Sequence, residues 1–573
     1  MKENLNTDYS AGTFTSEIEF ELHEWQAENK VERLWKGDPT LWTNSDENKW
    51  TGWLALPQEK SEISRIKTLA TEISAEKTTD IVLLGMGGSS LCPAMFSEIF
   101  KSVDNFPRLH ILDSTDPDEI LYIQNQINLK NTFFIVSSKS GTTLEPTIFK
   151  DYFYNQLQKI MPKEEIGSRF IAITDPGTPL ETLAIKENFK AIFHGVPSVG
   201  GRYSALSNFG MVPLGLMGID VETFLNNAKT MYEACLPTTP AKNNPGIVLG
   251  AVLGIAEKNG KDKLTLVVSK KIKSLGAWLE QLIAESTGKQ DRGLIPIDQE
   301  PCGIPRVYGN DRIFAYIRLD NEPDQEQDRA IDALEQAGFM VVRLHVRDQM
   351  HLAAELFRWE IAIAVAGSII GINPFNQPDV EESKILALEI TSQYDKTKTY
   401  VAPEPFFSTD GISLFADDKS LQSIHVELNE PPSLEKYFHA FINLAEKNYY
   451  VDFSAFLAMF DKNILPLQKC RVLVRDATLL ATCLGFGPRF LHSTGQDYKG
   501  GPNKGLFFQI TSEHKNDIPV PDHHYTFGFV INAQAEADFS VLAKRDRRIL
   551  RIHLHDDVEK GLNDIVRIFS NVL

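Results

Sequence analysis

Two loops rich in glycine and hydroxyl side chains could bind a phosphate group. Residues 85–90 read GMGGSS after the apolar run 81–84, and residues 137–143 read SSKSGTT after the apolar run 133–136. Backbone N–H groups at the start of a helix, together with Ser and Thr hydroxyls, bind phosphate oxygens. Because the loops would end neighbouring parallel strands, they could bind one phosphate from two sides. The sequence therefore predicts a protein that binds a sugar phosphate.

A dinucleotide site and simple helix capping are the alternatives for these loops. The first loop lacks the third glycine of the GxGxxG fingerprint, because Ser90 stands at that position, and no distinctive acidic residue closes a following strand. A dinucleotide site is therefore not expected. The hydroxyls of the second loop could cap a helix, but four hydroxyls and Lys139 exceed what a cap requires, which favours phosphate binding.

Gln281 and Glu285 are spaced for acid–base chemistry on one side of a helix. They stand one helical turn apart, and the predicted helix ends at Gly288. The apolar run 282–284 would partly desolvate the carboxylate, which raises its pKa and makes it a stronger base. The alternative is a surface glutamate near the end of a helix.

Arg202 and Lys384 are the candidate cations. Arg202 follows Gly200 and Gly201, which allow the backbone to approach a ligand closely, and its charge could stabilise an enediolate. Lys384 follows a loop, at the resumption of a helix, and could reach back towards the same pocket as a donor. The alternatives are a structural ion pair for Arg202 and an exposed surface lysine for Lys384.

The elements that would position these residues alternate between strands and helices. This alternation predicts an α/β fold of doubly wound parallel sheets, with ligands beyond the carboxyl ends of the strands. The predicted strands of a first unit are 81–84, 109–112, 133–136 and 170–173. Those of a second unit are 264–268, 293–297, 313–319 and 340–346, closed by an apolar helix over 359–372.

The last hundred residues read as a partial repeat of the second unit. The aligned blocks are 266–268 with 473–475, 285–288 with 492–495, and 343–348 with 551–556. We therefore divide the chain into four parts. They are an N-terminal helical wrap (1–76), a first subdomain (77–225), a second subdomain (226–388) and a C-terminal α/β region (389–573).

Composition limits the possible partners. The net charge of −19 over 573 residues argues against nucleic acid and anionic membranes. Five scattered cysteines without CxxC spacing fit a reduced, cytoplasmic protein. No secretory signal is visible at the N-terminus, and the apolar segment 361–372 is too short to span a bilayer.

Five of these motifs together resemble the glucose-6-phosphate isomerase family. They follow the family's order and span about residues 34–388. The matching blocks are 85–89, 138–143, 200–204, 285–289 and 373–384. Residues 485–496 and 499–503 resemble the C-terminal part of bifunctional transaldolase/glucose-6-phosphate isomerase proteins. Because the chain has no room for a transaldolase barrel, it resembles the isomerase part standing alone.

The resemblance implies reversible isomerisation of glucose 6-phosphate and fructose 6-phosphate through a cis-enediol, as in glycolysis and gluconeogenesis. It implies two sugar-isomerase (SIS) subdomains and no metal or organic cofactor. Glu285 would move a proton between C1 and C2, Arg202 would stabilise the enediolate, and Lys384 would assist ring opening. The implied sugar- and phosphate-binding residues are Gly88, Ser89, Ser138, Lys139, Ser140, Thr142, Thr143 and Gln281.

One family residue has no match in this sequence. The family's ring-opening histidine usually comes from the other subunit of a dimer, and the alignment places Gly303 or a neighbour there. His492 is the candidate replacement, because the repeat aligns it with Glu285. The alternative is a histidine that caps a helix in a decayed copy. A homodimer and a monomer both remain open.

Two other functions fit the same motifs. The Ser-Gly-Thr-Thr loop permits a broader C2 pocket, as in a dual phosphoglucose/phosphomannose isomerase. A non-enzymatic sugar-phosphate sensor could use the same sheets, but it would not need Glu285, Arg202 and Lys384 together.

Overall fold

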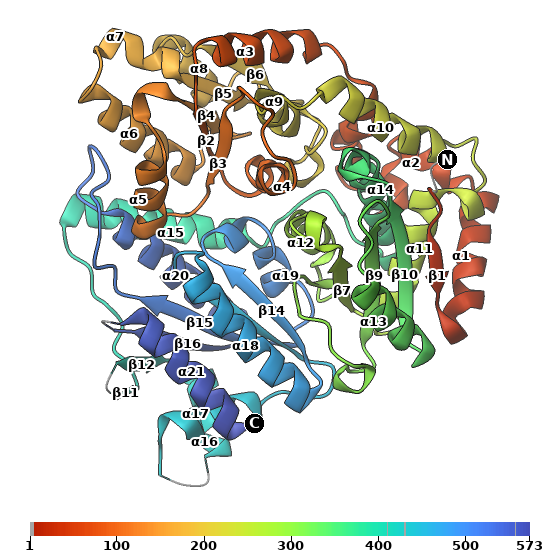
Figure 1. Ribbon diagram of the computed structural model, residues 1–573. Helices are drawn as coiled ribbons and strands as arrows, with labels where there is room; N and C mark the ends of the chain where they lie inside the picture. The colour runs from red at the N-terminus through yellow and green to blue at the C-terminus, as the bar shows by residue number, and fades with distance from the viewer. Residues whose placement is uncertain (1–4, 410, 429–430, 556) are drawn as a thin grey trace.

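Three sheets flanked by helices make up the chain in a computed structural model that describes residues 5–409, 411–428, 431–555 and 557–573 (Figure 1). The first sheet and its helices are drawn orange to yellow, the second lies beside them in green, and the third lies below in blue. The predicted α/β class with parallel sheets is confirmed. None of the helices in the described ranges combines the length and apolar character needed to cross a bilayer.

The first sheet is wholly parallel, with strand order β3-β2-β4-β5-β6. Its central strands are buried along their whole length and mostly apolar, because helices cover both faces. The strands are β2(Asp80–Leu84), β3(Arg108–Leu112), β4(Thr132–Ser137), β5(Phe170–Thr174) and β6(Ala191–His194). The helices are α3(Ile63–Ala75), α4(Leu91–Ile99), α5(Pro117–Gln126), α6(Leu144–Gln158), α7(Lys163–Ile166), α8(Pro179–Lys186) and α9(Asn208–Leu216).

The second sheet has strand order β1-β10-β9-β7-β8. Its strands are β1(Asp8–Ser10), β7(Lys263–Val268), β8(Ile295–Ile297), β9(Arg312–Leu319) and β10(Met340–Val346). Its helices are α10(Val221–Ala234), α11(Pro245–Lys258), α12(Leu275–Thr287), α13(Gln325–Gln336) and α14(Leu352–Ile370). The buried helices α11 and α14 pack against each other beside this sheet.

The N-terminal segment is not purely helical. Helices α1(Thr15–Ala27) and α2(Lys30–Trp35) are present as predicted. Sequence reasoning missed β1, which pairs antiparallel with β10 and extends the second sheet. Figure 1 shows β1 and α1, drawn red, beside the green second unit.

The third sheet has strand order β11-β12-β16-β15-β13-β14. Its strands are β11(Phe407–Thr409), β12(Ile412–Phe415), β13(Tyr450–Phe456), β14(Ala481–Phe486), β15(Gly505–Ser512) and β16(Arg548–Leu554). The helices that follow α14 are α15(Glu381–Thr397), α16(Asp418–Glu427), α17(Leu434–Ile442), α18(Asp461–Thr478), α19(Gly495–Gly500), α20(Phe527–Lys544) and α21(Val558–Val572).

The third sheet repeats the topology of the second, but not through the alignment proposed from the sequence. The order β10-β9-β7-β8 corresponds to β16-β15-β13-β14. Residues 473–475 lie in α18, so their alignment with strand β7 is wrong. Residues 492–495 follow β14, whereas residues 285–288 precede β8, so that block is also misaligned. Of the three aligned blocks, only 343–348 with 551–556 falls on corresponding strands, β10 and β16, and residue 556 lies outside the described residues.

Candidate active site

The centre of the site is a buried ion pair between Arg202 and Glu285. Arg202 lies in the short 3₁₀ turn η8(Gly201–Tyr203), and Glu285 lies near the end of α12. Arg202 Nη1 is 3.2 Å from Glu285 Oε2, and the two side chains are only 1% and 8% exposed. Burial raises the pKa of Glu285, and the charges of Arg202 and Lys384 reduce this rise without cancelling it. The carboxylate is therefore a stronger base than an exposed glutamate.

Four further acceptors hold the guanidinium of Arg202. It donates to Ser286 Oγ at 2.7 Å, Pro374 O at 2.6 Å, Asn376 O at 3.0 Å and Gln377 Oε1 at 3.0 Å. Each of these partners occupies a fixed place in α12 or in the loop after α14. The arginine therefore has a single orientation beside the carboxylate, as a preorganised charge requires.

Glycines allow the first loop to approach both η8 and the third unit. Gly87 has φ +56°, and a Cβ added there would lie 2.9 Å from His492 Cβ. A Cβ added at Gly88 would overlap the backbone of Gly201. A side chain at either position would therefore push Arg202 or His492 away from the loop.

Gln281 connects α12 with the third unit. Its Nε2 donates to the backbone oxygen of His492 at 2.9 Å. Its Oε1 is buried and accepts no hydrogen bond from the described residues. The amide therefore keeps one acceptor for a ligand hydroxyl, one helical turn before Glu285.

His492 of the third unit reaches the first unit at the start of α6. It ends the 3₁₀ turn η13(Arg489–His492), and its Nε2 lies 3.1 Å from Glu145 Oε1. Gln534 of α20 donates to the same oxygen at 2.7 Å, and Thr115 donates to Gln534. Burial would raise the pKa of Glu145, but the charge and hydrogen bond of His492, together with the backbone N–H of Glu145 and the charge of Lys384, lower the net pKa. Glu145 is therefore a charged carboxylate that orients the imidazole.

The two candidate lysines are paired with carboxylates outside the central ion pair. Lys384 lies in α15 and donates to Glu381 Oε1 at 2.9 Å. Its charge opposes the rise in the pKa of Glu285 and contributes to the lowered pKa of Glu145. Lys139 forms an ion pair with Asp175 at the end of β5, so its charge is already partly neutralised.

The second loop lies directly before α6. Its hydroxyls are paired with one another, Ser138 Oγ with Thr143 Oγ1 and Ser140 Oγ with Thr142 Oγ1, each at 3.0 Å. Ser137 Oγ donates to the carbonyl of Ser89 in the first loop at 3.1 Å. The two predicted loops are thus neighbours at the carboxyl edge of the first sheet.

Gly303, aligned with the missing family histidine, lies against the third unit. A Cβ added there would lie 3.0 Å from a guanidinium nitrogen of Arg475 in α18, and Arg475 also donates to the carbonyl of Pro301. The third unit therefore covers this segment with Arg475, whereas His492 contacts Gln281 and Glu145 instead.

Comparison with known proteins identifies the family. A family model described as phosphoglucose isomerase matches residues 55–301. A glucose-6-phosphate isomerase of Prochlorococcus marinus (strain NATL2A) is 32% identical over 365 residues, which are 56% of this chain and 67% of that protein. The chain belongs to the glucose-6-phosphate isomerase family.

Other members of the glucose-6-phosphate isomerase family extend this result. The enzyme of Lactococcus lactis subsp. cremoris (strain MG1363) is 28% identical over 437 residues, 66% of this chain and 94% of that protein. The crystal structure of a glucose-6-phosphate isomerase from Chlamydia trachomatis shares the fold, with a TM-score of 0.57 at 20% identity over 68% of this chain and 89% of that one. The predicted family and isomerase class are confirmed. Arg202 and Glu285 lie inside the matched segment, whereas Lys384 and His492 lie beyond it.

Sequence reasoning missed several residues of this glucose-6-phosphate isomerase site. Glu145 could have been selected from the sequence, because it is an acidic residue in the first turn of the helix that follows the hydroxyl loop. Gln377 lies within the matched 373–384 block but was not singled out. Gln534 had no local signal, since only the packing of α20 brings it to Glu145.

Proposed function

We propose that this member of the family interconverts glucose 6-phosphate and fructose 6-phosphate, with Glu285 moving a proton between C1 and C2. The observation that carries the proposal is the buried pair of Glu285 and Arg202, 3.2 Å apart. Glu285 takes the proton from one carbon and returns it to the next, so no proton is lost overall. Arg202 faces the negative charge that develops on the enediolate oxygen.

His492 opens the sugar ring in this proposal. As an imidazolium it gives a proton to the ring oxygen of glucose 6-phosphate while the bond from C1 to that oxygen breaks. The C1 hydroxyl becomes the aldehyde, and its proton passes through water back to the neutral imidazole. The 3.1 Å contact with Glu145 supports this role, because a carboxylate stabilises the imidazolium and fixes its orientation. Lys384, within electrostatic range of Glu145 and Glu285, assists as a second cation.

The second loop, residues 137–143, binds the phosphate in this proposal. The chain carries a net charge of −19, and Lys139 is paired with Asp175. The phosphate is therefore bound mainly by backbone N–H groups and by the hydroxyls of Ser138, Ser140, Thr142 and Thr143 at the start of α6. Gly88, Ser89 and Gln281 contact the sugar.

The third unit completes the site within one chain. It contributes His492 and Gln534, so a monomer contains every proposed residue. We propose that the chain is of the kind found as the isomerase part of bifunctional transaldolase/glucose-6-phosphate isomerase proteins, that it divides at residues 76, 225 and 388, and that it is cytoplasmic. A sugar phosphate, and neither nucleic acid nor membrane, is its partner.

A coupled enzyme assay tests the proposed reaction. The purified chain is supplied with fructose 6-phosphate, and glucose 6-phosphate is detected by its oxidation with a dehydrogenase. Steady turnover without added metal is expected. Absence of turnover by the folded chain would contradict the proposal.

A further inference from the structure

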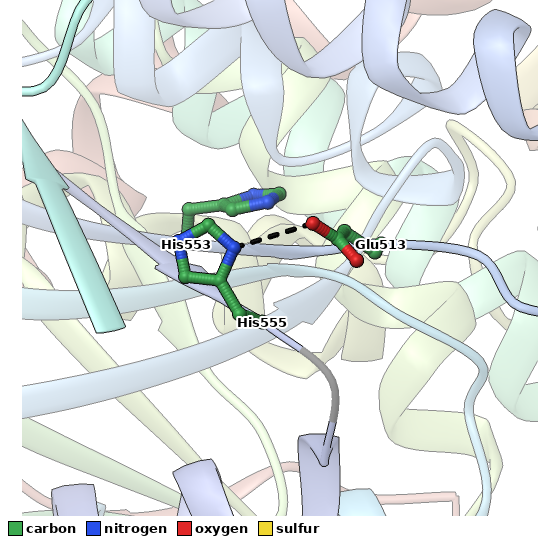
Figure 2. A group of neighbouring side chains, drawn as sticks. All are labelled: Glu513, His553 and His555. Atoms are coloured by element: carbon green, nitrogen blue, oxygen red, sulfur yellow. Dashed lines mark hydrogen bonds and ion pairs between the residues drawn. The ribbon is translucent and has the colours of Figure 1, made fainter. Parts of the chain in front are cut away.

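The third sheet carries a group of metal-ligating side chains away from the active site. Glu513 directly follows β15, His553 lies in β16, and His555 follows β16 (Figure 2). One nitrogen or carboxylate oxygen from each residue lies within 4.8 Å of the others. Among the described residues, this is the one group of three such side chains at that spacing. It lies at the carboxyl ends of parallel strands, where α/β sheets bind ligands.

The separation of two of these atoms fits a tetrahedral cation. His555 Nδ1 is 3.3 Å from Glu513 Oε1, the contact drawn as a dashed line in Figure 2. Zinc bonds of about 2.0–2.1 Å at a tetrahedral angle place two ligand atoms about 3.4 Å apart. A cation therefore fits beside this pair without moving it, and His553 offers a third ligand atom within 4.8 Å of the other two.

The second ring nitrogen of each histidine is held by a hydroxyl. His553 Nδ1 lies 2.9 Å from Thr511 Oγ1, and His555 Nε2 lies 2.9 Å from Ser413 Oγ. Thr511 and Ser413 lie in strands β15 and β12, on either side of β16. His553 Nε2 and His555 Nδ1 are therefore the ring nitrogens that could bind a cation together with Glu513. Metal-binding histidines show the same arrangement, in which the second ring nitrogen is hydrogen bonded and the ligand is thereby oriented.

The geometry points to a site for a late first-row divalent cation such as Zn²⁺, bound by Glu513, His553 and His555. Two imidazoles and one carboxylate suit zinc and its neighbours, whereas Mg²⁺ and Ca²⁺ prefer oxygen ligands alone. Three protein ligands leave one position for water.

The position of the site suggests what the cation does. Glu513 begins the segment that leads into α20. Tyr525 of that segment, with Phe527 and Val530 of α20, packs in the core of the first unit. A cation that joins Glu513 to β16 would fix the start of this segment. The effect would be on docking of the third unit, and the cation takes no part in the isomerisation.

Metal titration of the full chain tests the site. The untagged protein is stripped with EDTA, dialysed, and titrated with Zn²⁺ by calorimetry. Wild type is compared with Glu513→Gln and His555→Gln, and the control is His439→Gln, an exposed histidine of α17 in the same unit. We expect one Zn²⁺ per chain in wild type and control, at least 10-fold weaker binding in both site variants, and little competition from millimolar Mg²⁺.

A second measurement distinguishes loss of metal binding from loss of the folded structure. Zn²⁺ should raise the melting temperature of wild type and control but not of the two site variants, and the metal-free variants should keep isomerase activity. Binding that is absent in wild type, unchanged by both substitutions, or abolished by Mg²⁺ would overturn the proposal. Absence of isomerase activity in the wild type would contradict the proposed reaction and would not bear on the metal site.

Discussion

His492 Nε2 lies 3.1 Å from Glu145 Oε1, although the two residues are 347 positions apart in the sequence. The contact joins the third sheet's unit to the helix that follows the hydroxyl loop of the first. Gln281 holds the backbone of His492, and Gln534 holds the carboxylate of Glu145. The imidazole is therefore fixed by residues of all three units.

Substitution of His492 by alanine should mainly impair ring opening. Turnover of the cyclic anomers should fall about 10²–10⁴-fold. Proton exchange on the open-chain substrate should fall far less, because Glu285 and Arg202 do not depend on the imidazole. Steady-state kinetics and exchange of the C2 proton with solvent deuterium would measure the two effects.

The matched control is His425→Ala, which removes an exposed histidine of the same unit. It should leave both rates unchanged. Equal losses of turnover and exchange in the His492 variant would remove this residue from the ring-opening step.

The position of His492 predicts that activity does not require a second chain. Because one chain contains every proposed residue, specific activity should stay constant on dilution. Light scattering and the isomerase assay over the same concentration range would test this. Activity that disappears as a dimer dissociates would show that a second chain completes the site.

Asp116 makes the stability of the first unit depend on pH. Burial raises its pKa to about 7, with a smaller contribution from Asp118. The folded chain therefore binds more protons than the unfolded chain between about pH 4 and pH 7. Stability falls as the pH rises through this window, by at most about 4 kcal/mol from this group.

Asp116→Asn should remove this dependence and keep the cap of α5, where Asp116 Oδ1 accepts from the N–H of Asp118 at 2.8 Å. The variant's gain in melting temperature over wild type should be larger at pH 8 than at pH 5. Thermal unfolding at both values is the measurement. A gain that is equal at both pH values would show that the carboxyl does not titrate there.

Local patterns were sufficient to predict four of the five strands in each of the first two sheets, all except β6 and β1, and to select Arg202 and Glu285 as candidate residues. The apolar runs before Gly85 and Ser137 are strands β2 and β4, because strands covered on both faces need continuous apolar sequence. Glu285 and Arg202 each lie in a short motif whose chemistry is local.

Long-range contacts could not be predicted from local sequence patterns. The antiparallel pairing of β1 and the ion pair of Lys139 with Asp175 depend on packing between distant segments. The repeat alignment that suggested His492 was wrong, because similar residues occur in elements of different type. His492 nevertheless lies at the site, because the docking of the third unit determines its position.

Glu285→Gln tests the proposed proton transfer most directly, with Glu280→Gln on the same helix as its control. The variant should bind fructose 6-phosphate within a few-fold of wild type by calorimetry, while kcat falls about 10²–10⁴-fold, because only the transfer in the transition state is lost. The Glu280→Gln control should keep both substrate binding and kcat near the wild-type values. Turnover near the wild-type value in Glu285→Gln, or parallel losses of binding and kcat, would contradict the assignment of Glu285 as the base.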